Sequence, residues 1–160
     1  MRNAVVLVAA LLCLGVGSEA RSSSERDDDL LKFETMFGVR GPFLGPTNAI
    51  RGVPGAGAAW RLSRAEGELG ADGKLEIEVR GLVLVSTGAN PVANFRGLVS
   101  CQSIDGTGAP NVVNVSTGDF PASPAGDAEI EADVELPSPC IAPIVFVTNP
   151  AGRWFAVTGR

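Results

Sequence analysis

The sequence predicts an all-β protein, an antiparallel β-sandwich of about seven strands that is immunoglobulin-like in its general architecture. The clearest evidence is the stretch AEIEADVEL at residues 128–136, where apolar and acidic side chains alternate. A period of two is typical of a strand with one buried and one solvated face. Turn-forming sequences separate the other short apolar runs, as they do in an antiparallel sandwich. A small closed β-barrel has a similar number and length of strands and is the alternative.

Residues 1–20 have the pattern of a secretory signal peptide. The apolar run at residues 4–16 is roughly 13 residues long, shorter than the ~20 that span a bilayer. Ser18 and Ala20 are the small residues of a cleavage site, so we expect cleavage after Ala20 and no membrane span in the mature chain. The expected location is therefore secreted, either extracellular or periplasmic.

Cleavage of the signal peptide discards Cys13 and leaves two cysteines, Cys101 and Cys140. In an oxidising compartment such a pair normally forms a disulfide. Closing a loop of about 40 residues stabilises a fold by roughly 4 kcal/mol in the chain-entropy model. Two buried free thiols are the alternative, and a catalytic dithiol is disfavoured because the C-x-x-C spacing is absent.

Residues 21–39 are predicted to be a mobile N-terminal segment that can form a short helix. Leu30, Phe33 and Phe37 follow an acidic run at positions i, i+3 and i+7, and Gly38 can end the helix. So short a helix persists only if its apolar face docks on something. We expect these three residues to cover the apolar end of the hairpin that follows.

Residues 40–57 are a Gly/Pro-rich connecting segment that leads into a sandwich domain at residues 58–160. One interpretation is a binding loop with Arg40, Phe43 and Arg51 as ligand contacts. The other is an edge strand followed by a wrapping connection. Trp154 is a further candidate contact, as a stacking platform for a sugar ring, although core packing is the default for a tryptophan.

Residues 60–85 form the best-defined hairpin. A three-residue loop at 71–73 places Gly73 where a left-handed conformation is required and sets Leu69 opposite Leu75. A two-residue turn sets Leu69 against Glu76, which the side-chain parity disfavours. The register makes one face apolar throughout, formed by Ala65, Leu69, Leu75, Ile77, Val79 and Val83.

The same register sets Glu66 opposite Glu78 and Glu68 opposite Glu76. Directly opposed like charges are destabilising, so one interpretation is a bound Ca²⁺, which accepts oxygen ligands alone. The other is a solvated face neutralised by neighbouring basic residues. The characteristic calcium-loop motif is absent from the sequence, and we expect no cofactor.

Five further strands are predicted at short intervals, over residues 94–103, 111–117, 128–136, 141–148 and 153–158. Asn114-Val115-Ser116 within the second of them matches the N-glycosylation pattern. In the third strand, four acidic side chains project from one face at steps of about 7 Å. That spacing resembles the carboxylate separation of an inverting glycosidase, but four carboxylates in a row also form an ordinary solvated face.

Histidine and tyrosine are absent from the whole chain. Without imidazole there is no Ser-His-Asp or Cys-His pair and no histidine-ligated metal. A net charge of −5 disfavours nucleic acid as a partner. The leading hypothesis is a secreted, disulfide-stabilised, non-enzymatic interaction or structural module with an unknown extracellular protein or glycan as its partner. The alternatives are a carbohydrate- or calcium-dependent binding domain and a histidine-free hydrolase.

Overall fold

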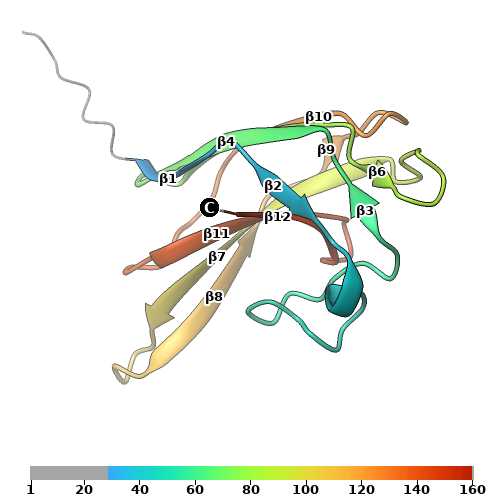
Figure 1. The fold of residues 1–160 in the computed structure, drawn as a ribbon. Helices are drawn as coiled ribbons and strands as arrows, with labels where there is room; N and C mark the ends of the chain where they lie inside the picture. The colour runs from blue at the N-terminus through green and yellow to red at the C-terminus, as the bar shows by residue number, and fades with distance from the viewer. Residues whose placement is uncertain (1–28, 160) are drawn as a thin grey trace, which may run out of the picture.

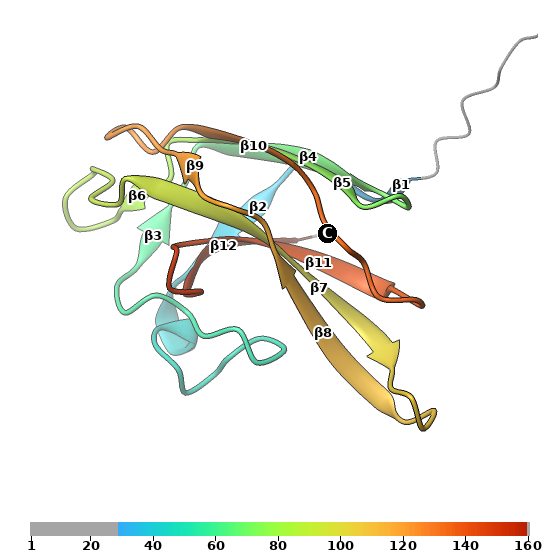
Figure 2. The ribbon, with the colours of Figure 1, turned by 180° about the vertical axis from the view of Figure 1, so that it is seen from behind.

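The computed structural model describes residues 29–159, which form two antiparallel sheets packed face to face (Figures 1 and 2). Sheet A has the order β1 (Asp29–Phe33), β4 (Arg64–Gly70), β5 (Lys74–Arg80), β10 (Ala128–Asp133). Sheet B has the order β2 (Met36–Gly38), β12 (Trp154–Thr158), β11 (Ile141–Thr148), β7 (Asn94–Ile104), β8 (Pro110–Ser116), and β9 (Phe120–Pro121) also pairs with β7. The predicted signal peptide and its Cys13 lie outside the described residues.

Three smaller elements complete the fold. β3 (Trp60–Arg61) and β6 (Val83–Leu84) pair with each other, and a 3-10 turn, η1, spans Gly41–Phe43. No helix in residues 29–159 is long and apolar enough to cross a membrane. The described strands stay in open sheets, so the predicted sandwich is confirmed in preference to the barrel.

The predicted hairpin register is confirmed. β4 and β5 pair Leu69 with Leu75 and Ala65 with Val79, as side-chain parity requires. Gly73 ends the three-residue loop at φ +93°, where a side chain is disfavoured. The predicted apolar face is buried in the sandwich, where it meets the inner face of sheet B.

Residues 29–38 form two short strands, so the predicted N-terminal helix is wrong. β1 pairs with β4 in sheet A and β2 pairs with β12 in sheet B, so the segment crosses from one layer to the other. Phe33 is buried against Gly67, whereas Leu30 and Phe37 are exposed. Pairing with both sheets supplies backbone hydrogen bonds and burial that a helix this short cannot obtain alone. The segment therefore forms strands instead of a helix.

An aromatic cluster fills one end of the core. Trp60 stacks on Phe155 with the ring centroids 3.9 Å apart, and Phe95 meets both rings edge-on at 6.5 and 5.7 Å. The rings from β7 and β12 therefore cover the apolar end of the hairpin. Only Phe33 of the three residues expected to do so is buried.

The predicted disulfide between Cys101 and Cys140 is formed. Cys101 is fully buried on β7, and Cys140 lies immediately before β11, the neighbour of β7 in sheet B. The bond therefore holds the chain at the point where it enters sheet B from β10 of sheet A.

Residues 41–57 wrap across the face of sheet B that is turned away from sheet A (Figure 1). Backbone hydrogen bonds of 3.0 Å join Trp154 N to Pro54 O and Ala56 N to Trp154 O. The segment is thus the wrapping connection of the second interpretation, and it adds a third layer over part of sheet B.

Candidate functional site

The outer face of sheet A carries six glutamates in two rows across three strands. Strand pairing aligns Glu66, Glu78 and Glu129 in one row and Glu68, Glu76 and Glu131 in the other. The hairpin supplies two members of each row, which the sequence register anticipated. β10 supplies the third, and its position beside β5 is a matter of tertiary structure.

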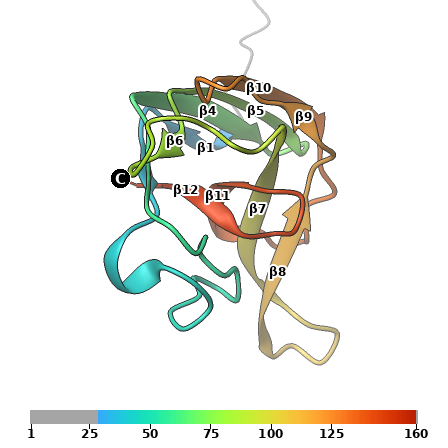
Figure 3. The same ribbon diagram turned by 90° about the vertical axis from the view of Figure 1, so that its right-hand side faces the viewer.

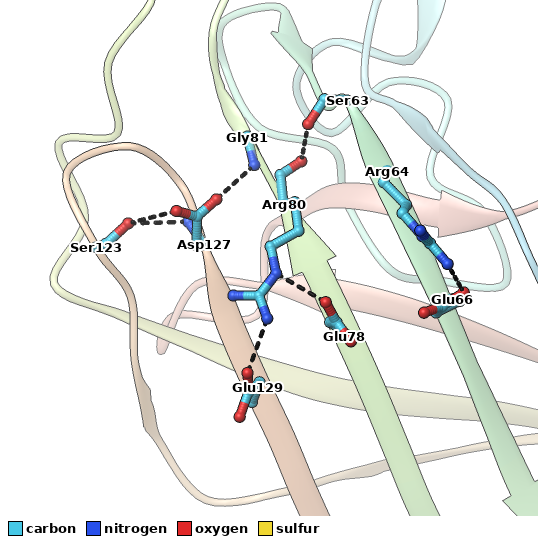
Figure 4. Close-up of polar contacts among 9 residues, drawn as sticks. All are labelled: Ser63, Arg64, Glu66, Glu78, Arg80, Gly81, Ser123, Asp127 and Glu129. Carbon is cyan, nitrogen blue, oxygen red and sulfur yellow. Dashed lines mark hydrogen bonds and ion pairs between the residues drawn. The ribbon is translucent and has the colours of Figure 1, made fainter.

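Each glutamate in these two rows forms an ion pair with a lysine or arginine side chain. Arg80 bridges β5 and β10, with Nε 2.8 Å from Glu78 Oε1 and Nη2 2.8 Å from Glu129 Oε1 (Figure 4). Hydrogen bonds to Glu129 and Glu78 raise the pKa of Arg80. The other pairs are Arg64–Glu66 at 2.6 Å, Lys74–Glu76 at 2.5 Å, Lys74–Glu131 at 3.9 Å and Lys32–Glu68 at 3.5 Å.

Each of the four calcium candidates, Glu66, Glu68, Glu76 and Glu78, therefore has a basic partner. Across residues 29–159, no group of three or more acidic side chains is placed to hold a metal ion. The geometry thus favours the solvated, charge-paired interpretation of this face over a calcium site.

A shallow hollow of about 420 Å³ lies over the same face, between the two rows of glutamates. Its carboxylates are poor candidates for acid-base chemistry, because the side chains of Glu129 and Glu131 are 75% and 73% exposed. A catalytic acid needs a pKa raised by burial beside apolar groups. The resemblance to a glycosidase carboxylate spacing is therefore not accompanied by the burial that such chemistry requires.

The end of this sheet is fastened by short polar contacts (Figure 4). Gly81 N donates to Asp127 Oδ1 at 2.9 Å, and Asp127 N donates to Ser123 Oγ at 3.1 Å. Ser63 Oγ donates to Arg80 O at 2.8 Å. These contacts hold the turn before β10 against the end of β5, which is a structural role.

The four candidate ligand contacts, Arg40, Phe43, Arg51 and Trp154, do not form one open site, although the rings of Phe43 and Trp154 are in contact. Trp154 is 2% exposed and packs between Phe43 and Phe146, with ring centroids 6.3 and 6.0 Å away, so it offers no open ring face to a sugar. Arg51 is turned inward and donates from Nη1 to Ser100 O at 2.8 Å. Arg40 and Phe43 are exposed, but neither lies in a described hollow.

A different surface lies at the far end of sheet B, beyond the wrapping segment, where the β7–β8 hairpin projects from the body of the molecule (Figure 3). Three large apolar side chains are exposed here, Ile104 at 53%, Val112 at 42% and Ile141 at 53%. Pairing of Gln102 with both Val112 and Ile141 puts these two on the same face. Ile104, two residues after Gln102, shares it. We call these three residues the apolar end of sheet B.

Within residues 29–159, β7 is the only neighbour of β8 in the sheet, so β8 forms a free edge of the described sheet beside this apolar end. Hydrogen bonds from Asp105 N to Ala109 O and from Thr117 N to Gly97 O lie at the two ends of the β7–β8 pairing. In an antiparallel pair, such bonds recur at alternate residues. The odd-numbered residues of β8 therefore bond to β7, and the backbone groups of Val112, Asn114 and Ser116 point away from it.

Side chains occupy little of this edge. Asn111 Oδ1 accepts from Val112 N at 2.8 Å, and the Asn114 side chain turns back to donate to Arg51 O at 3.0 Å. This surface was not among the predicted sites, although the sequence carries one signal for it. Residues 106–118 contain no charged side chain, in a chain with 31 Lys, Arg, Asp and Glu residues (13 + 18).

No protein family, curated protein or solved structure matches the chain. The geometry of its own residues therefore carries the argument on function. Of the surfaces described, the β8 edge with the apolar end of sheet B combines unpaired backbone groups and exposed apolar side chains.

Proposed function

We propose that the chain is an exported, non-enzymatic interaction module that binds an extended segment of a protein partner along the free edge of β8. The observation that carries the proposal is the edge itself. Val112, Asn114 and Ser116 present backbone donors and acceptors at alternate positions, and exposed apolar side chains lie beside them. Strand addition supplies main-chain hydrogen bonds for affinity and side-chain contacts for specificity.

The rest of the scaffold suits such a role. Native edge strands are usually protected by charges, prolines or bulges, whereas β8 has a single proline at its start and no charge. The disulfide anchors β7, the strand that holds β8, so the edge is presented on a braced support. A rigid edge lowers the entropy cost of binding a flexible segment.

Absence of enzymatic activity is part of the proposal. The chain has no histidine, and the glutamates on sheet A are exposed and ion-paired. Export is supported by the signal-like residues 1–20 and by a disulfide that an oxidising compartment favours.

Selection from a displayed library of random peptides of about 12 residues tests the proposal, since strands of 5–6 residues are typical. We expect selected peptides to protect the amides of Val112, Asn114 and Ser116 from hydrogen exchange, because these amides face away from β7. Val112→Lys should abolish binding, because a lysine on an edge strand opposes strand addition.

The matched control is Val85→Lys, which adds the same charge at a valine that is 54% exposed and remote from β8. It should bind the selected peptides as the wild type does. The proposal is refuted if no peptide is selected, or if the selected peptides protect other amides and bind Val112→Lys unchanged.

A further inference from the structure

We propose that the partner of β8 is β8 of a second copy of this chain, so that two B sheets join edge to edge about a two-fold axis. This inference rests on the proposed function, because it uses the same edge as a strand-addition site. A symmetric dimer of this kind is isologous, with the same surface contributed by both copies.

The distribution of charge permits self-pairing at β8 and opposes it at β10. Two copies of an acidic chain repel each other, and like charges directly opposed across strands are destabilising. β10, the edge of sheet A, carries Glu129, Glu131 and Asp133, so self-pairing there opposes carboxylates. β8 brings no charged side chain to the same contact.

The other two edges are less suited. β2 at the opposite edge of sheet B spans only three residues, and β1 of sheet A carries charged side chains. Among the sheet edges in residues 29–159, β8 is thus the longest, with seven residues, and it carries no charged side chain.

The alternation of backbone groups along β8 permits a two-fold axis at Val113. An antiparallel self-pair centred there sets Val112 opposite Asn114 of the second copy, and both residues belong to the set that points away from β7. Ser116 then lies opposite Pro110 of the second copy, where the proline accepts a bond but cannot donate one. The register gives about six interchain hydrogen bonds.

Side chains on both faces fit this register. Val113 meets its own symmetry copy on the inner face, where β-branched residues pack well across strands. On the outer face, Val112 and the neighbouring Ile104 and Ile141 of both copies lie on one continuous sheet surface. In this contact the Val112 amide leaves the Asn111 side chain that holds it and bonds to the second copy.

Sedimentation velocity on the disulfide-bonded chain, from about 1 µM to about 500 µM, tests the dimer, a range that detects dissociation constants in the micromolar region. We expect a concentration-dependent monomer–dimer equilibrium. Val112→Lys should weaken dimerisation at least about tenfold, and Val85→Lys should leave it unchanged. Val112→Pro should also give a monomer while retaining the fold, because the amide it removes does not bond to β7.

Cysteine cross-linking tests the register. A mixture of Val112→Cys and Asn114→Cys chains should form a mixed disulfide faster than either chain alone, because these positions are directly opposed across the axis. Both side chains lie on the outer face, away from the buried Cys101.

A wild-type chain that stays monomeric throughout this range overturns the inference, as does a dimer that Val112→Lys leaves intact. If the monomeric chain still binds selected peptides along β8, the homodimer alone is refuted and the proposed strand addition stands. If the chain is monomeric and selects no peptide, both fail.

Discussion

Removing the disulfide by Cys101→Ala together with Cys140→Ala should destabilise the protein by about 4 kcal/mol. The two residues are 39 positions apart, and cross-linking a loop of this length removes about that much chain entropy from the unfolded state at 25 °C. β11 already pairs with β7 in the folded state, so we expect little change in the native strand order. The loss comes mainly from the unfolded chain.

Urea unfolding followed by tryptophan fluorescence measures this loss. Trp60 and Trp154 are both buried, so their emission reports the unfolding of the core. With a slope of about 2 kcal/mol per molar urea, the midpoint should fall by about 2 M. Since small domains have net stabilities of about 5–15 kcal/mol, the loss is a large fraction of the free energy of unfolding.

The wild-type chain with its disulfide reduced is the control, and it should unfold close to the double variant. A loss below about 1 kcal/mol in both samples would refute the reasoning, because it would mean that the unfolded chain is already confined without the bond.

Three further predictions concern single side chains. Arg51→Ala should lower the free energy of unfolding by about 1–2 kcal/mol, because a charged donor to a strand carbonyl is lost. Arg40→Ala, at an exposed position, should leave the stability in urea unchanged. Equal losses in the two variants would contradict the assigned contact. Gly73→Ala should lower the free energy of unfolding by about 2–3 kcal/mol and Gly108→Ala by about 1 kcal/mol. Both glycines have positive φ, but of the two only Gly73 faces a backbone oxygen, 2.1 Å from where its Cβ would lie. Thermal melts should therefore show a larger loss for Gly73→Ala. Hydrogen bonds from the threonine two residues later and from nearby amides lower the pKa of Asp105. Its stabilisation is therefore present above the ordinary value of about 3.9 and is lost as the pH falls through the lowered value. The stability gap between wild type and Asp105→Asn should shrink below that pH, and a gap that stays constant from pH 6 to pH 2 would argue against the assignment.

The hairpin and the acidic strand could be predicted because their information is local. In the hairpin, Gly73 and the parity of Leu69 and Leu75 restrict the register to a single loop length, which the structure has. The helix prediction for the N-terminal segment was wrong because the structure of this segment depends on contacts that are remote in the sequence. Leu30, Phe33 and Phe37 match a helical spacing by sequence alone, but pairing with β4 and β12 outweighs so weak a local preference.

The candidate sites divide in the same way. The facing glutamates were predicted from the hairpin register, but only tertiary structure brought Lys32 of β1 to Glu68 and Glu129 of β10 to Arg80. Trp154 was a candidate only while its cover was unknown, and the wrapping segment supplies that cover. Whether a surface side chain is open depends on contacts that are remote in the sequence.

The sequence by itself determined the fold class, the hairpin register and the pairing of Cys101 with Cys140. These follow from the period of two, from turn chemistry and from having only two cysteines after the predicted signal peptide. Tertiary structure alone decided the order of strands, and with it that β8 ends sheet B and β10 lies beside β5. The physical reason is that a strand's side chains encode which face it buries, whereas its backbone hydrogen bonds are satisfied by whichever strand lies next to it.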